Sequence, residues 1–147
     1  MSQIIKKASL SLMALAFVSL SAMATGNATK STKTSAFNWN PVMDAIIQVE
    51  SGGDPKAVSG NSVGAMQITP ILVKDCNEIL KRRKSKMRYT MSDRYSVAKS
   101  KEMFLLIQNY YNPENSVEKA IRSWNGGVKY SVKATNRYYK KVLAKMK

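Results

Sequence analysis

The feature that most constrains this chain is the helical spacing of its apolar residues from Phe37 onward. Apolar side chains recur three and four residues apart, which is the pattern of helices that bury one face. No segment of useful length alternates as a half-buried strand would. Glycine pairs and prolines divide the pattern into segments at about 40–51, 70–80, 90–113, 115–125 and 130–146. We therefore predict a mainly α single domain, with about five helices around a polar, glycine-rich loop.

Helix-start signals stand at the head of four of these segments. Two pair a capping side chain with proline at the first helical position. The other two have capping-box spacing, with an acidic residue three positions after the cap. The expected caps, each with the residue that completes its signal, are Asn40–Pro41, Thr69–Pro70, Thr90–Asp93 and Asn115–Glu118.

The N-terminus has the layout of a secretory signal. Lys6 and Lys7 precede an apolar run over residues 10–20, and a small-residue cleavage pattern ends at Ala24. The run is shorter than the roughly 20 residues of a membrane span, although an uncleaved anchor is the alternative. We expect a signal peptide over 1–24, a flexible lead-in over 25–37 and a folded domain over 38–147. Cleavage would remove both lysines and lower the net charge from +15 to +13.

The titratable residues exclude several kinds of chemistry. The chain has no His and one Cys, which rules out a Ser-His-Asp triad, an imidazole metal site, a thiolate zinc cluster and an intrachain disulfide. No cofactor motif or metal site is expected. The lone Cys76 lies among apolar neighbours and is expected to be buried. Acid–base chemistry must therefore come from the nine carboxylates, Lys or Tyr.

Glu50 is the strongest candidate among the carboxylates. It follows the apolar stripe of the first helix by one turn, so its carboxyl should be half-buried and its pKa raised. A protonated Glu in a cleft is the general acid that glycosidic cleavage requires. The glycines at 52 and 53 would let a bulky polymer approach. A solvated Glu at the end of a helix is the alternative.

Three motifs, in order along the chain, resemble those of the soluble lytic transglycosylase family. The resemblance covers about residues 40–143, and the combination is specific although each motif alone would be weak. The motifs are Glu50-Ser51-Gly52-Gly53-Asp54-Pro55, Gly64-Ala65-Met66-Gln67 and Ser123-Trp124-Asn125-Gly126-Gly127.

The resemblance implies a lysozyme-like, goose-type fold with a catalytic cleft. It implies cleavage of the β-1,4 bond between N-acetylmuramic acid and N-acetylglucosamine in peptidoglycan. Glu50 would be the sole acid/base, first protonating the glycosidic oxygen and then drawing the proton from the muramoyl C6 hydroxyl, which closes a 1,6-anhydro ring. This route uses no cofactor. The implied substrate-binding residues are Ser51, Met66, Gln67, Trp124 and Asn125.

Some of these residues have equally plain structural interpretations. Met66 would also suit core packing, and Asn125 would suit a helix end before two glycines. Trp124 stands where the family usually has Tyr, which removes a phenol that could contact Glu50, and Ala65 replaces the usual Leu. Other hydroxyls that could serve instead are those of Tyr110, Tyr111 and Tyr130.

Two other functions stay open. A goose-type lysozyme would let water attack, and a second carboxylate about 5–9.5 Å from Glu50 would favour that reaction. Asp54 and Asp93 are the candidates, although Asp54 suits a turn and Asp93 a helix start. A non-catalytic module binding an anionic cell-wall polymer would use the positive charge. Its binding surface would be residues 81–88, six of which are basic; a solvated loop is the alternative interpretation of this run.

The expected setting is the periplasm or cell envelope of a bacterium, with the membrane contacted only through the signal segment. Peptidoglycan glycan strands are the expected partner of a monomeric enzyme. A secretion, conjugation or phage-related envelope complex is a candidate assembly. Nucleic acid is not expected, because the export signal argues against an intracellular partner.

Overall fold

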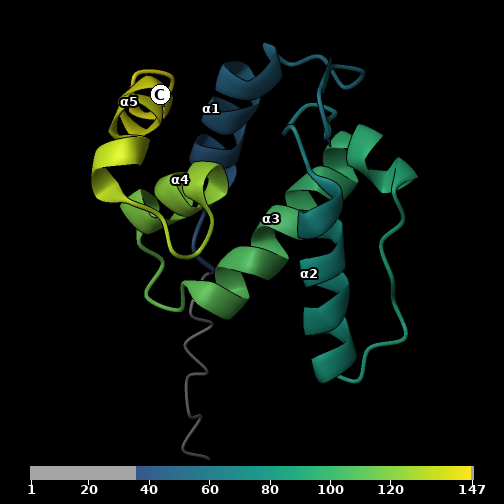
Figure 1. Cartoon of the computed structure of the whole chain (residues 1–147). Coiled ribbons are helices and arrows are strands. Elements are labelled where there is room, and N and C mark those ends of the chain that lie inside the picture. The colour runs from purple at the N-terminus through teal and green to yellow at the C-terminus, as the bar shows by residue number, and fades with distance from the viewer. Residues whose placement is uncertain (1–35, 147) are drawn as a thin grey trace, which may run out of the picture. The chain divides into compact units, whose positions relative to one another are not determined.

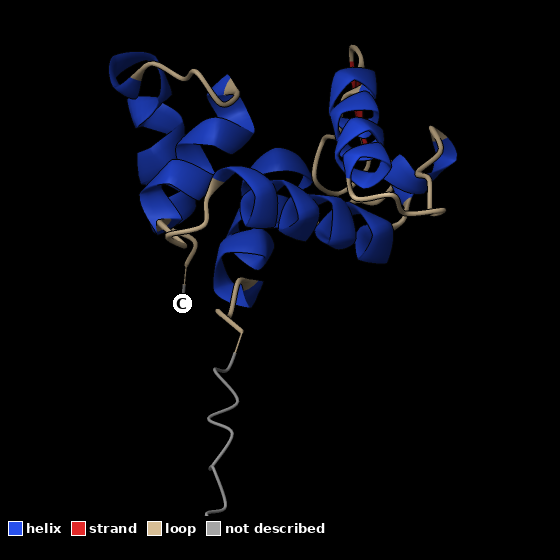
Figure 2. Cartoon of the chain, turned by 90° about the horizontal axis from the view of Figure 1, so that it is seen from below, coloured by secondary structure: helices blue, strands red, loops and turns tan. Residues whose placement is uncertain are grey.

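The computed structural model describes residues 36–146, and the predicted signal segment and most of the lead-in lie outside this range. The predicted mainly helical architecture is confirmed (Figures 1 and 2). The helices are α1 (Asn40–Ser51), α2 (Pro70–Arg82), α3 (Val97–Tyr111), α4 (Val117–Gly126) and α5 (Val132–Leu143), with a short 3₁₀ helix η1 (Ser92–Tyr95) before α3. Two short strands, β1 (Val58–Ser59) and β2 (Ser62–Val63), form an antiparallel hairpin.

One of the four predicted caps, that of α2, acts as expected. The Thr69 side chain accepts a hydrogen bond from the Leu72 backbone N–H at the start of α2. At the start of α1, the helix includes Asn40, and it is the Asn38 side chain that accepts from the Asn40 N–H at 3.1 Å. The helix begins one residue earlier than predicted, so Trp39, whose side chain forms no capping bond, takes the cap position. The α2 cap is therefore confirmed as predicted, and the α1 cap is displaced by one residue.

The other two predicted caps are displaced. Thr90 lies just before η1 rather than at the start of α3, and Asp93 of η1 accepts from the Thr90 backbone N–H at 2.6 Å. Ser96 then caps α3. Asn115 lies in the left-handed region at φ +55°, which Asn tolerates, and the neighbouring Ser116 caps α4 instead.

One aromatic side chain joins three of the packed helices. Phe104 of α3 is fully buried. Its ring lies 5.6 Å from that of Trp39, just before α1, and 5.3 Å from that of Trp124 on α4. Around this centre, α4 packs on α5, α1 on both α4 and α5, and α2 on α3 (Figure 1). The free thiol of Cys76 on α2 is buried in this core, as predicted.

The loop between α1 and α2 is pinned at one glycine. Gly64 has φ +80°, and a Cβ there would lie 1.9 Å from the Arg94 carbonyl oxygen. Val63 and Ile68 form an isolated antiparallel bridge just around it. Only glycine permits both the left-handed backbone and this approach of the η1 backbone. The glycine-rich loop is therefore a fixed wall rather than a free segment.

A buried guanidinium clamps α4 to α5. Arg122 is 4% exposed, and its Nε donates to Glu118 Oε1 at 2.7 Å. Its Nη1 donates to the Val132 carbonyl and to Thr135 Oγ1, both at the start of α5. Its Cζ also lies 4.2 Å from the centre of the Tyr139 ring. These contacts fix the position of α5, the helix that faces Glu50.

Within residues 36–146, no helix combines the length and apolar character that crossing a membrane requires.

Candidate active site

Glu50 lies near the C-terminal end of α1, where the chain turns into the glycine-rich loop. Its side chain is only partly exposed, and its Oε1 accepts a 2.7 Å hydrogen bond from the Tyr138 hydroxyl on α5. This contact joins two helices whose interacting residues stand 88 positions apart in the sequence. The pairing exists because α1 and α5 pack side by side (Figure 1).

Burial sets the ionisation of this pair. Burial raises the pKa of Glu50 above its ordinary value, and the hydrogen bond from Tyr138 lowers it by a smaller amount. Burial and the charge of Glu50 also raise the pKa of Tyr138, so its hydroxyl stays protonated and acts as a donor. A carboxyl whose pKa is raised by burial and that is held at a fixed hydroxyl is suited to donating and accepting a proton.

An open hollow of about 410 Å³ surrounds the Glu50–Tyr138 pair. Glu50 is the one carboxyl among the residues that line it. The lining residues are Val49, Glu50, Asn125, Ala134, Arg137, Tyr138 and Lys141. Of the predicted substrate-binding residues, the structure therefore brings Asn125 to the acid.

Ser51 is placed beside the acid but forms internal contacts. Its hydroxyl donates to the Ala65 carbonyl at 2.8 Å and accepts from the Gly53 backbone N–H at 3.1 Å. It thereby ties the end of α1 to the second motif and shapes the turn after the acid. The predicted role in substrate binding requires these bonds to be exchanged for contacts with sugar.

The second motif faces the core more than the hollow. Met66 is fully buried, which favours core packing over a place in the cleft lining, and its contact with substrate stays a prediction. The Met66 carbonyl accepts from Trp124 Nε1 at 3.3 Å, which draws this segment inward. Gln67 has φ +51°, and its Nε2 donates to the Gly64 carbonyl at 3.0 Å. That amide group holds the loop in its tight turn.

Trp124 does not line the hollow and instead packs behind the site. Its ring is partly buried against Phe104, and its Nε1 is bonded to the Met66 carbonyl. The phenol expected to be missing here is supplied from α5 by Tyr138. Of the tyrosines considered from the sequence, Tyr110 instead accepts a hydrogen bond from Arg82.

The two candidate second carboxylates serve as local turn residues. Asp54 Oδ1 accepts from the Lys56 backbone N–H at 2.8 Å. Asp93 accepts from the backbone and the hydroxyl of Thr90, and these bonds lower the pKa of Asp93. Neither lines the hollow around Glu50. The described residues also contain no cluster of three His, Cys, Asp or Glu that could hold a metal ion.

Sequence reasoning missed Tyr138 as a functional residue. The signal was present, because Tyr138 shares a helical stripe with Ala134 and Val142, and a Tyr on a buried stripe needs a partner for its hydroxyl. What the spacing did not reveal was which polar group that partner would be.

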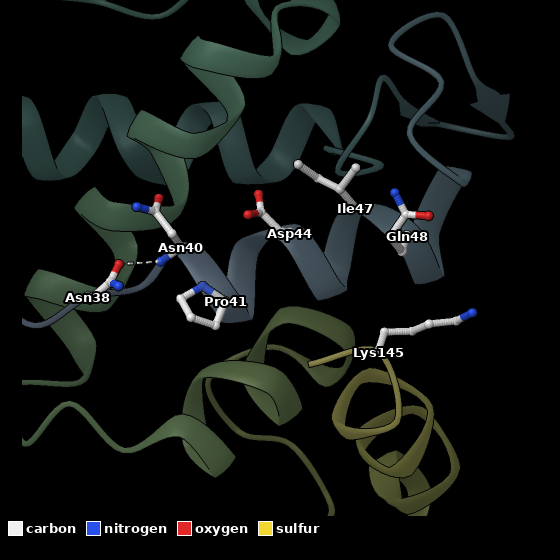
Figure 3. A pocket seen from close by; sticks show the side chains of 7 residues that line it. All are labelled: Asn38, Asn40, Pro41, Asp44, Ile47, Gln48 and Lys145. Atoms are coloured by element: carbon white, nitrogen blue, oxygen red, sulfur yellow. Dashed lines mark hydrogen bonds between the residues drawn. The ribbon is translucent and has the colours of Figure 1, made fainter. Parts of the chain in front are cut away.

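A second hollow, of about 700 Å³, lies toward the N-terminal part of α1 (Figure 3). Its one carboxyl, Asp44, is paired with Lys101 at 2.6 Å and is exposed. This carboxyl is therefore exposed to solvent and already bound to a cation. The lining residues are Asn38, Asn40, Pro41, Asp44, Ile47, Gln48 and Lys145. The smaller hollow at Glu50 is therefore the better candidate for acid catalysis.

Comparison with known proteins agrees with the motifs. No curated protein and no solved structure matched the chain. The model of the transglycosylase SLT domain family matches residues 27–146, which is most of the chain and begins within the predicted lead-in. As the motif resemblance predicted, the chain belongs to the transglycosylase SLT domain family and is a peptidoglycan lytic transglycosylase, an enzyme that cleaves glycosidic bonds.

Proposed function

We propose that Glu50 is the single acid/base of this enzyme, which cleaves the β-1,4 bond between N-acetylmuramic acid and N-acetylglucosamine and leaves a 1,6-anhydro end. The observation that carries the proposal is the Glu50–Tyr138 pair, a partly buried carboxyl with raised pKa at a 2.7 Å hydrogen bond. Glu50 is also the one carboxyl lining its hollow. A mechanism that needs a single carboxyl suits this site better than one that needs two.

In the proposed reaction, Glu50 first gives up one proton and later takes up another. Protonated Glu50 donates it to the glycosidic oxygen as the bond from that oxygen to the muramoyl C1 breaks. The resulting carboxylate then takes the proton of the muramoyl C6 hydroxyl, whose oxygen bonds to C1 and closes the ring. Glu50 ends protonated, as it began. The Tyr138 hydroxyl holds the carboxylate through the intermediate stage, because a hydrogen bond to the charged form stabilises it.

The products of purified peptidoglycan test this proposal by mass spectrometry. Muropeptides lighter by one water than hydrolytic products, formed by the wild type and lost in Glu50→Gln, are the expected result. Reducing ends would instead identify a goose-type hydrolase. If Glu50→Gln still forms the same products as the wild type, another group is the acid. No products from the wild type, with salt-sensitive binding to the wall, would favour the binding module.

We also propose that the protein is exported and acts in the cell envelope. The support is the Lys6–Lys7 pair, the apolar run and the small residues ending at Ala24, together with a family substrate that lies outside the cytoplasm. Mass determination of the protein recovered from the envelope is the test. A mature N-terminus at Thr25 is expected, whereas an intact Met1 would favour the uncleaved anchor.

A further inference from the structure

The helix that supplies Tyr138 presents two cations to the same hollow. Arg137 and Lys141 both line it, together with Ala134 and Tyr138. These four positions follow the spacing of one helix face, so α5 turns a continuous surface toward Glu50. The hollow is therefore lined by one acid and two positive charges, and the proposed proton transfers through Glu50 use neither cation.

The two cations have no partners within the described residues. Neither Arg137 nor Lys141 forms a hydrogen bond or an ion pair there, and both side chains are exposed. No ion pair joins either of them to Glu50, so the acid is not neutralised. Helix α5 carries four cations and no carboxyl. These charges are thus available to an anionic group that enters the hollow.

The spacing of the pair suits a carboxylate. Side chains at i and i+4 on a helix start about 5–6 Å apart, so the guanidinium and the ammonium can converge on one anion. A guanidinium can bind a carboxylate through two parallel hydrogen bonds, while an ammonium adds a point charge. The sugar rings of the glycan carry no charge, and the anionic groups of peptidoglycan are the carboxylates of its peptide stems.

We propose that Arg137 and Lys141 form a subsite that binds a stem-peptide carboxylate, so that the enzyme prefers glycan whose muramoyl residues still carry their peptides. The inference rests on the proposed function, because the muramoyl residue that bears the stem is the one whose C1 reacts at Glu50. The stem then lies along α5 while the glycan lies over the acid. Arg137 and Lys141 set specificity, and proton transfer remains with Glu50.

The test compares kcat/KM on three soluble glycan substrates: strands with intact stems, the same strands with stems removed, and strands whose stem carboxylates are amidated. The preference is the ratio of kcat/KM on intact strands to kcat/KM on stripped strands. In the full chain carrying Arg137→Ala and Lys141→Ala, this ratio should be about tenfold lower than in the wild type. The control Lys133→Ala with Lys140→Ala removes the same charge from α5 outside the hollow. Its preference should stay within about twofold of wild type. Amidated stems should reduce the wild-type preference by about the same tenfold.

Three outcomes would overturn the inference. These are an unchanged preference in the variant at 137 and 141, an equal fall in the control, and full preference for amidated stems. Failure of the proposed function looks different. In that case the wild type cleaves none of the three substrates, or Glu50→Gln cleaves them as well as wild type. Because both cations are exposed, their removal should leave the fold intact, which a thermal melt of each variant confirms.

Discussion

Replacing Tyr138 with Phe removes one hydroxyl from the active site and keeps the ring. That hydroxyl donates a 2.7 Å hydrogen bond to Glu50, which is the usual length for a hydroxyl donor. Such a bond contributes about 1.5–3 kcal/mol when one partner is ionised, against about 0.5–1.5 kcal/mol when both are neutral. The free energy of unfolding lost by the variant should therefore depend on the ionisation of Glu50.

The sign follows from the pKa of Glu50, which burial raises above its value in the unfolded chain. Stability from this group is fully present below the unfolded pKa and declines as the pH rises through the folded pKa. Without the Tyr138 donor the charged form is stabilised less, so the decline is steeper. The variant should lose about 0.5–1.5 kcal/mol near pH 3.5 and about 1.5–3 kcal/mol near pH 7.5.

Thermal melts followed by circular dichroism provide the assay. At about 4 °C per kcal/mol for a domain of this size, the expected decrease in Tm is about 2–6 °C in acid and about 6–12 °C at neutral pH. Tyr139→Phe is the matched control, because the Tyr139 hydroxyl forms no hydrogen bond within the described residues. In a Glu50→Gln background the pH dependence should vanish. Equal losses at the two pH values, or a larger loss in acid, would refute the reasoning.

Three further predictions concern the scaffold around the site. Gly64→Ala should lower the free energy of unfolding by about 3–5 kcal/mol, since its Cβ would lie 1.9 Å from the Arg94 carbonyl oxygen. Gly60→Ala is the control, because a Cβ there has no neighbour within 4 Å. It should lower the free energy of unfolding by about 1 kcal/mol, and urea titration of both variants measures the difference. Arg122→Ala should lower the free energy of unfolding by about 2–4 kcal/mol, because it removes the contacts that hold α4 to α5. A loss under about 1 kcal/mol, the net value of a single hydrogen bond, would contradict that role. Burial raises the pKa of Cys76 to about 12, so a thiol reagent at about pH 8 should react only as fast as the protein opens.

Local patterns predicted the helices, and their exact starts depended on neighbours. The Thr69 cap was predictable because the Thr-Pro pair satisfies the first turn by itself. The α4 cap was not, because Asn115 and Ser116 are both able to cap, and the left-handed turn at Asn115 assigns the cap to Ser116. The backbone conformation of the preceding turn decides which of two adjacent candidates caps the helix.

In the candidate site, too, some features follow from local sequence patterns and others depend on distant parts of the chain. Glu50 was predictable, since the apolar stripe before it implied partial burial. The full burial of Met66 did not follow from the sequence, because the side-chain directions in its loop depend on the bridge between Val63 and Ile68. Tyr138 was missed because its partner is set by the packing of α1 on α5, which no local spacing encodes. Contacts over long sequence separations are the part of the site that a single sequence does not reveal.

The separation of Glu50 and Tyr138 along the chain has a consequence for when the enzyme becomes active. The acid arrives on the first helix of the domain and its hydrogen-bond partner on the last, 88 residues later. A chain that is still being synthesised or threaded through a pore holds Glu50 before α5 has emerged. Contacts of such long range form late, after the intervening segments have been ordered. Given the proposed role of Glu50, we predict that wall cleavage begins only once the entire domain has folded.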